Sequence, residues 1–527
     1  MLVVAAALLI TISSAFFENA AGDVYPVGDS AMLEIYARHA AHGIWTLGPY
    51  SQFGWHHPGP LYFYLLAPLY LLSGEKTVAL HVGAFVINLV SLCVIACVLI
   101  RYAAPGVALA VAVAMGVFLF RVQPVISSFW NPHVVVLPAA AFMVLCAALA
   151  AGRRGALPAV VLAGSFLAQT HISLAPYVLL LSLAALGATA WRTTHTQTQA
   201  RSLGWWTSVS TSLLLLLWLL PIAEQLRGTP GNVTLLLRFF ADPSPGQELR
   251  TALVAWGDAI GALFERHITI PEGLPLQIQT DSIPITTAWA IVQVLLLAIA
   301  SVDALRRQNR FDAALSAAGL LASIIALWSI TRVKSLVGDY MVFWMSAIGA
   351  MNWAVLAGLA LARFAAIERR ALPRWAVLGA SALLVSGFVY TGSNQLKRAR
   401  RQGLSTPQGS ARVVKLASDA VLDDMARRRV QRPVFRLSTR DWGEAAGVLL
   451  QVYKRGVAPA VDASLVPFFG DPLAANGSED RTYVIADAAT HASLAHQPGD
   501  ELVASVEGMY IHASPIVNGP PAGPRRP

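Results

Sequence analysis

Long apolar segments dominate this chain and limit what it can fold into. About 20 apolar residues suffice to cross the hydrocarbon core of a bilayer. Hydrophobic residues make up 56% of the 527 residues and charged residues only 13%, a composition that excludes an ordinary soluble domain. The sequence therefore predicts a polytopic membrane protein with about 11 spans, near residues 2–17, 77–100, 105–120, 134–151, 157–170, 172–190, 205–222, 285–303, 313–330, 340–362 and 375–391.

Arginine residues lie on alternate sides of these segments. If the N-terminus is cytoplasmic, every inside loop is basic, as the positive-inside rule requires. The longer loops on the other side, such as 18–76 and 223–284, are mixed in charge. We therefore predict a multi-pass protein of the cell inner (plasma) membrane. The first segment has no basic region before it and no small-residue cleavage site after it, which favours an uncleaved anchor over a signal peptide.

The sequence changes character after residue 391, which we take as the end of the membrane domain. Helical patterns at 411–429 and 442–455 alternate with strand patterns at 433–437, 457–461 and 482–486. This alternation predicts a small α/β domain over residues 392–514. Because the domain follows the last span, we expect it on the extracytoplasmic side. Residues 515–527, rich in Pro, Gly and Arg, predict a disordered tail.

The first outside loop carries the most informative polar cluster. Gly28-Asp29-Ser30 opens a helical pattern over residues 29–42, and His56-His57-Pro58-Gly59-Pro60 is followed by the aromatic residues of 61–64. One interpretation is that Asp29 has no role beyond capping the start of this helix. A carboxylate at a membrane surface can also be a general base that takes a proton from an acceptor hydroxyl or amine.

These residues resemble those of the GT-C superfamily of membrane glycosyltransferases, and most closely the protein O-mannosyltransferase and lipid A aminoarabinose transferase group. The resemblance implies an all-α polytopic GT-C-like fold of about 11 transmembrane helices with a small C-terminal extracytoplasmic α/β domain. It also implies transfer of a hexosyl or pentosyl group from a polyprenyl-phosphate-linked donor, with Asp29 as the catalytic base. The second acidic residue usual in this family is replaced by Ser30, and Glu34 is the nearest substitute.

Other polar residues on the predicted outer side are candidates for binding the sugar or the phosphate. Arg332 and Lys334 lie between two late spans, where basic side chains can hold a phosphate or extend to the membrane interface. The remaining candidates for the pocket could equally satisfy local hydrogen bonds between helices: Glu34, His56, His57, Arg121, His133 and His171.

No cofactor is expected from the sequence. A divalent metal would have only Asp29, Glu34 and His57 as a plausible cluster, and no histidine spacing typical of metal sites appears. Glycine-rich nucleotide loops are absent from the sequence, which disfavours a nucleotide-sugar donor.

The expected partners are a polyprenyl-phosphate-sugar donor, membrane lipid and an acceptor that is an envelope glycan, lipid or protein. Nucleic acid is disfavoured, because the basic residues are concentrated in short loops between spans. Two other classes remain open. A transporter or flippase would place charges within its spans, which are almost free of them here. A non-catalytic membrane scaffold would not need Asp29.

Overall fold

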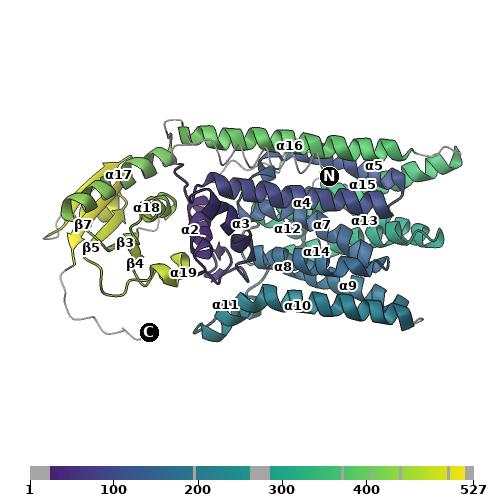
Figure 1. Ribbon diagram of the computed structural model, residues 1–527, viewed down its shortest axis with the longest axis horizontal. Helices are drawn as coiled ribbons and strands as arrows, with labels where there is room; N and C mark the ends of the chain where they lie inside the picture. Colours follow the sequence, from purple (N-terminus) through teal and green to yellow (C-terminus); the bar gives the residue numbers. More distant parts are fainter. Residues whose placement is uncertain are drawn as a thin grey trace.

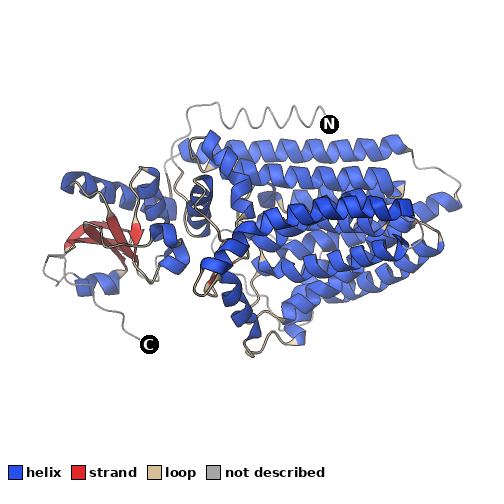
Figure 2. Ribbon diagram, turned by 60° about the horizontal axis from the view of Figure 1, so that its bottom comes forward, coloured by secondary structure: helices blue, strands red, loops and turns tan. Residues whose placement is uncertain are grey.

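A helical bundle and a smaller sheet-containing domain make up the protein (Figures 1 and 2). The computed structural model describes residues 24–193, 197–261, 285–368, 373–404, 407–437, 442–494 and 499–516. The predicted first span, residues 2–17, and residues 517–527 of the predicted tail lie outside the described residues.

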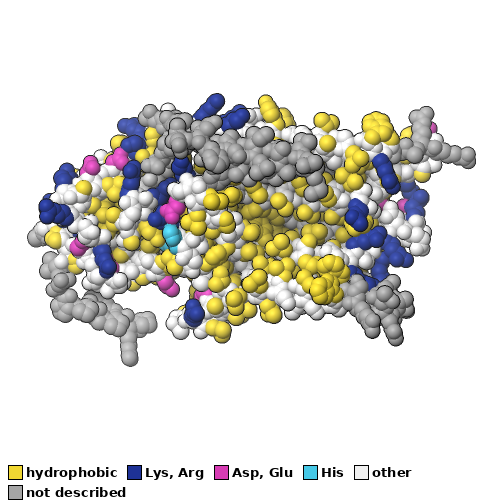
Figure 3. All heavy atoms as spheres, in the orientation of Figure 1, with side chains coloured by type: hydrophobic (Ala, Val, Ile, Leu, Met, Phe, Trp, Pro, Cys, Tyr) yellow, Lys and Arg dark blue, Asp and Glu magenta, His cyan; other side chains and the backbone are white. Residues whose placement is uncertain are grey.

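Eight of the described helical segments are long and apolar enough to cross a membrane. They are α4 (Val78–Tyr102), α6 with α7 (Asn131–Val134 and Val136–Ala150), η3 with α9 (Ile172–Leu174 and Ala175–Thr193), α10 (Gln197–Arg227), α13 (Ile285–Arg306), α14 (Arg310–Thr331), α15 (Asp339–Ile367) and α16 (Arg374–Leu404). The predicted spans 105–120 and 157–170 are also helices, α5 (Pro105–Arg121) and α8 (Leu157–Thr170), but shorter. Apolar side chains cover much of the outside of the bundle, as expected of a surface that faces lipid (Figure 3).

Helix α7 lies at the centre of the bundle and packs against α4, α8, α9, α14 and α15. Its alanines allow these neighbours to approach closely, which is how helices associate in lipid. Helices α5 and α15 meet at two glycines: a Cβ on Gly106 would come within 2.6 Å of the carbonyl oxygen of Gly358. Side chains larger than glycine would therefore separate these two helices.

The loop between the first predicted span and α4 folds into a cap over one end of the bundle. It contains α2 (Asp29–Ala41), the paired strands β1 (Tyr50–Ser51) and β2 (Trp55–His56), and α3 (Leu61–Leu72). The 12 residues of α3 would extend about 18 Å, less than the hydrocarbon core of a bilayer. Two further helices, α11 (Asn232–Ala241) and α12 (Leu249–Gly261), follow α10.

A five-stranded sheet forms the core of the C-terminal domain, with the strand order β4-β3-β5-β7-β6. Its β3 is parallel to β4 and β5, whereas β7 is antiparallel to β5 and β6. The elements of this domain are, in chain order, α17 (Ser410–Arg428), β3 (Pro433–Leu437), α18 (Trp442–Lys454), β4 (Ala460–Val461), α19 (Val466–Phe469), η5 (Asp471–Leu473), β5 (Arg481–Ala486), α20 (Ala488–Leu494), β6 (Glu501–Val506) and β7 (Met509–Pro515). Two short 3-10 helices, η1 (Gln123–Ile126) and η2 (Arg154–Ala156), lie in the loops of the bundle.

The α/β character of this domain is confirmed, but β6 and β7 were not predicted. Helix α16 also continues through residue 391, where the sequence suggested a boundary, and ends at Leu404. Helix α16 therefore extends beyond the bundle and joins it to the C-terminal domain.

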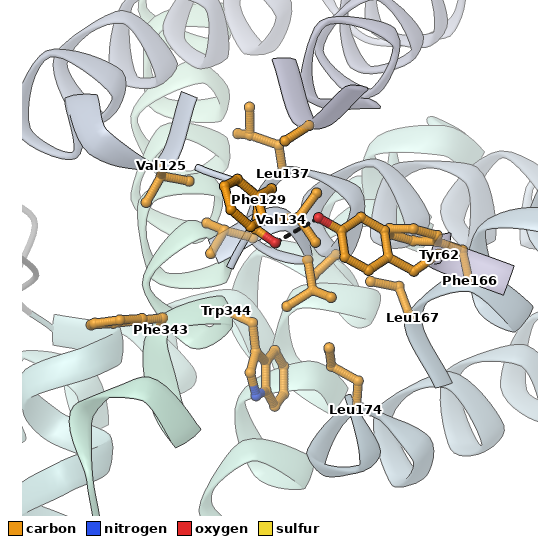
Figure 4. Packing of buried hydrophobic residues seen from close by; sticks show 14 of the residues in the cluster. Tyr62, Val125, Phe129, Val134, Leu137, Phe166, Leu167, Leu174, Phe343 and Trp344 are labelled. Atoms are coloured by element: carbon orange, nitrogen blue, oxygen red, sulfur yellow. Dashed lines mark hydrogen bonds between the residues drawn. The ribbon is translucent and has the colours of Figure 1, made fainter. Parts of the chain in front are cut away.

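The C-terminal domain rests on the cap, so that α2 lies between the sheet and the bundle (Figure 1). The Gly28 N–H donates to the carbonyl oxygen of Gly443 over 2.9 Å, and the Tyr36 hydroxyl donates to that of Phe468 over 2.5 Å. Beneath the cap, buried aromatic and aliphatic side chains fill the bundle, and the Tyr62 hydroxyl donates to the Phe129 carbonyl oxygen over 2.6 Å (Figure 4). These contacts hold the cap in a fixed position at the end of the bundle.

Candidate functional site

A large cavity lies where the bundle, the cap and the C-terminal domain meet. Its volume is about 2280 Å³, above the usual range for drug-sized ligands. It is lined by the start of α2, the segment before α6, the junction of α8 and α9, the ends of α11 and α14, and the start of α15. Its lining includes charged and polar residues together with apolar residues such as Leu179, Leu180, Phe240 and Met345. The cavity can therefore hold a ligand with both a polar group and a hydrocarbon chain.

Asp29 is the first residue of α2 and lines this cavity. The N-cap is Gly28, whose positive φ of 58° suits glycine, so Asp29 does not have the capping role that the sequence left open. Its Oδ2 accepts a hydrogen bond from Trp130 Nε1 over 2.8 Å. Solvent in the cavity reaches the side chain. Desolvation by the surrounding walls nevertheless raises the pKa of the carboxyl, and this effect is larger than the lowering of the pKa by the Trp130 hydrogen bond. The result is a stronger base than an ordinary surface aspartate.

Two aromatic residues beside Asp29 were not foreseen from the sequence. The rings of Trp130 and Tyr340 lie 6.0 Å apart, and Gln52 Nε2 donates to the Tyr340 hydroxyl over 2.9 Å. These residues are far apart in sequence, and a scatter of aromatic residues near membrane interfaces is usual. Their position beside the carboxylate is visible only in the fold.

His57 and His171 form a stacked pair on the cavity wall, with ring centres 4.8 Å apart. The Ile172 N–H donates to His57 Nδ1 over 3.0 Å, so a neutral His57 carries its proton on Nε2. Desolvation, helped by the neighbouring histidines, holds the pKa of His57 well below its usual range, and desolvation lowers the pKa of His171 to about 4. Both rings are therefore neutral at physiological pH, and His57 can donate a hydrogen bond without bringing a charge.

His133 also lines the cavity, and its Nδ1 lies 2.9 Å from Ser128 Oγ. The ring packs against Trp130 with centroids 5.0 Å apart and against Phe343 with centroids 5.3 Å apart. His133 thus supports the tryptophan that contacts Asp29.

Arg332 and Lys334 follow α14 and line the same cavity as Asp29. The Arg332 guanidinium is exposed and lies 5.3 Å from the centre of the Trp328 ring. Lys334 Nζ donates to the carbonyl oxygens of Phe239 and, over 2.7 Å, of Asp242. Lysines often satisfy the last carbonyl groups of a helix in this way, here those at the end of α11.

Three predicted site residues are absent from the cavity lining of the described residues: Glu34, His56 and Arg121. Glu34 lies five residues beyond Asp29, which is about 140° around the helix, so the two side chains point in different directions. His56 is buried between two carbonyl oxygens, with Nδ1 and Nε2 each 2.9 Å from the oxygens of Gly48 and Pro467. Arg121 is the last residue of α5. The expectation that these three shape the pocket therefore has no support in the cavity's geometry.

Glu34 has a different environment from Asp29. It is fully buried and accepts hydrogen bonds from the hydroxyls of Tyr70 and Thr77 over 3.0 and 2.7 Å. Lys454 of the C-terminal domain forms a salt bridge to it at 2.9 Å. Glu34 thus joins the cap to the C-terminal domain.

Within the described ranges, no group of three or more His, Cys, Asp and Glu side chains is arranged to hold a metal ion. The cluster considered from the sequence is divided, because Glu34 bonds to Lys454 while Asp29 and His57 line the cavity.

No protein-family model and no curated protein matches the sequence. Among solved structures, the fold is similar to that of ArnT from Cupriavidus metallidurans. The crystal structure bound to undecaprenyl phosphate has a TM-score of 0.48 and 12% identity, and covers 97% of each chain. The structure in the apo state has a TM-score of 0.49 and 14% identity, also over 97% of each chain. This similarity assigns no role to any residue of the chain.

Proposed function

We propose that the protein is a membrane glycosyltransferase that moves a sugar from a polyprenyl-phosphate-linked donor to an acceptor on the extracytoplasmic face. One observation supports this most strongly. A single cavity is lined by a carboxylate, Asp29, by two cations, Arg332 and Lys334, and by apolar side chains. A base, groups that stabilise a departing phosphate and a place for a hydrocarbon chain are what this reaction needs.

In the proposed reaction, an acceptor hydroxyl or amine attacks the anomeric carbon of the sugar. The bond between that carbon and the phosphate oxygen breaks, and its electron pair leaves with the polyprenyl phosphate. Asp29 takes the proton from the acceptor, using the carboxylate oxygen that Trp130 does not bind. Attack on the side opposite the leaving group inverts the anomeric centre.

The cations would act on the leaving group. Arg332 has an exposed guanidinium that can form two parallel hydrogen bonds to phosphate oxygens. Lys334 uses part of its donor capacity on α11 and contributes charge to the same wall. The neutral His57 would donate Nε2–H to a sugar hydroxyl or a phosphate oxygen.

The C-terminal domain would form the acceptor side of the site. Trp442, Glu444, Ser464 and Phe468 line the cavity, and the Trp442 and Phe468 rings meet edge to face with centroids 5.4 Å apart. Trp442 is adjacent to Gly443, whose carbonyl oxygen binds Gly28 next to Asp29. Aromatic faces combined with a carboxylate and a hydroxyl suit a sugar-bearing acceptor.

The test is to give the purified full-length protein radiolabelled polyprenyl-phosphate sugars, hexosyl and pentosyl, together with envelope extracts as the acceptor source. We expect radiolabel to be transferred from at least one donor to an extractable product, with free polyprenyl phosphate released in equal amount. Absence of turnover and of donor binding for every sugar would contradict the proposal. Passage of intact donor across proteoliposome membranes without transfer would instead favour the transporter alternative.

A further inference from the structure

A second cavity lies at the opposite end of the bundle. Its volume of about 480 Å³ falls within the usual range for small-ligand sites. Helix α14 begins at this cavity with Arg310 and ends beside the first cavity at Thr331. Its 22 residues correspond to a length of about 33 Å, so the two sites are separated by roughly the thickness of a membrane.

Four arginines from three segments of the chain line this second cavity. Arg153 and Arg154 follow α7, Arg192 lies in the last turn of α9, and Arg310 opens α14. Among the described residues that line it, none is Asp or Glu. Like charges around one cavity repel each other, so a bound anion would stabilise the arrangement.

Packing helps to hold this cavity in shape. The Arg153 guanidinium lies 4.7 Å from the centre of the Tyr102 ring, and that ring lies 6.0 Å from Phe311. The Thr189 hydroxyl donates to the carbonyl oxygen of Leu149 over 2.8 Å, which ties the end of α9 to α7. The cavity is therefore walled by helix ends and by the short turns that join them.

Other arginines at this end of the bundle have a different environment. Asp303 pairs with Arg307 over 3.1 Å and also with Arg363. Basic side chains gather at this end of the molecule (Figure 3). The positive-inside rule accounts for basic residues in the loops, but it does not require four of them to meet around one cavity.

We propose that this cavity binds a phosphate group, and that its ligand is the headgroup of an acidic phospholipid in the leaflet at this end of the bundle. Arginine forks match phosphate oxygens in geometry as well as in charge. A site at the ends of membrane-spanning helices lies at headgroup depth, where such lipids are available. A soluble phosphate compound would present the same chemistry from the aqueous side. The proposal does not depend on the glycosyltransferase reaction.

The experiment uses the full-length protein in neutral detergent and measures bound lipid by native mass spectrometry. We expect phosphatidylglycerol to bind in preference to phosphatidylcholine. The double variant Arg154→Gln with Arg310→Gln should weaken this binding by about tenfold or more, a factor that corresponds to about 1.4 kcal/mol. Arg307→Gln removes the same charge from the same end and should retain the binding.

A second measurement distinguishes the two phosphate sources and does not need the double variant to fold. Pyrophosphate is added to the wild-type protein with bound phosphatidylglycerol, and lipid occupancy and the unfolding temperature are followed. Displacement of the lipid by pyrophosphate supports a shared phosphate site. Stabilisation by pyrophosphate without any preference for phosphatidylglycerol assigns the cavity to a soluble phosphate compound. Equal binding of both lipids together with no effect of pyrophosphate would overturn the proposal, as would lipid binding that is identical in the double variant and the wild type.

Discussion

The two faces of helix α2 use their carboxylates in different ways. Asp29 faces the large cavity, is reached by solvent and, among the described residues, accepts one side-chain hydrogen bond, from Trp130. Glu34 faces away from the cavity, is fully buried and is bound by Tyr70, Thr77 and Lys454. A carboxylate surrounded by donors has no free capacity for a substrate, whereas one with a single donor does. We therefore expect Asp29 to have a chemical role and Glu34 a structural one.

The largest expected effect is that of Asp29→Asn on the rate of sugar transfer. An amide cannot accept the acceptor's proton, and a positioned general base contributes about 10²- to 10⁴-fold. We expect kcat to fall by at least about 100-fold, with donor binding and unfolding temperature close to those of the wild type. Transfer is measured with the radiolabelled donor.

The matched control is Asp419→Asn, which removes an exposed carboxylate paired with Lys415 on α17, outside the cavity lining. It should retain the full rate. A wild-type rate in Asp29→Asn would show that the cavity carboxylate is not the base.

The opposite result is expected for Glu34. Removing one partner of a buried ion pair leaves the other charge without compensation and costs about 3 kcal/mol or more. Glu34→Gln should therefore lower the free energy of unfolding by about 3 kcal/mol while the folded fraction keeps its kcat. Thermal unfolding in detergent and active-site titration separate these two quantities.

The double variant Glu34→Gln with Lys454→Met provides the control, because it removes both charges. It should recover part of the stability that Glu34→Gln loses. If Glu34→Gln lowered kcat to the same extent as Asp29→Asn without any loss of stability, the two faces of α2 would not differ as we infer.

Replacing either cation of the cavity, Arg332 or Lys334, should have a smaller effect, which we expect on the affinity for the donor. Arg332 has an exposed guanidinium, and hydrogen bonds to charged groups contribute about 1.5–3 kcal/mol, so Arg332→Gln should weaken donor binding by about tenfold or more. Lys334→Met should lower donor affinity less, because Nζ is already bonded to carbonyl oxygens at the end of α11, and should also lower the unfolding temperature. Donor affinity is measured by equilibrium binding. Arg412→Gln, which breaks an exposed pair with Glu507, is the control that should leave affinity unchanged.

Patterns local in sequence predicted much of this architecture. The apolar segments after residue 24 coincide with helices, and the strand expected at 433–437 is β3 within the same bounds. Strand β6 was missed because none of its residues is fully buried and its register is irregular between Leu502 and Ala504, which weakens the alternation of apolar residues. Its two-residue turn to β7, Glu507-Gly508, has positive φ at both positions and is the signal that could have identified the hairpin.

The site was harder to predict because its contacts join distant parts of the chain. Charge alternation placed Asp29, Arg332 and Lys334 on one side, and the fold brings them to one cavity. The number of residues per helical turn could have shown that Glu34 does not share the face of Asp29. No local pattern could reveal that Trp130, 101 residues away, donates to Asp29, or that Lys454, 420 residues away, neutralises Glu34.

The smallest expected effect concerns the hydrogen bond that Asp29 does have. Trp130 Nε1–H stabilises the ionised carboxylate and so opposes the raising of its pKa by desolvation. In Trp130→Phe the pKa of Asp29 should therefore rise further. Because transfer requires the carboxylate form, activity is lost as the pH falls through this pKa, and the acid limb of the pH–rate profile should move to higher pH. At alkaline pH, where Asp29 is ionised in both proteins, kcat should differ by only about fivefold, equivalent to about 1 kcal/mol of positioning by the lost hydrogen bond. His133→Gln, which leaves the Trp130 donor in place, should keep the wild-type acid limb, and an unchanged limb in Trp130→Phe would show that the indole does not tune this carboxylate.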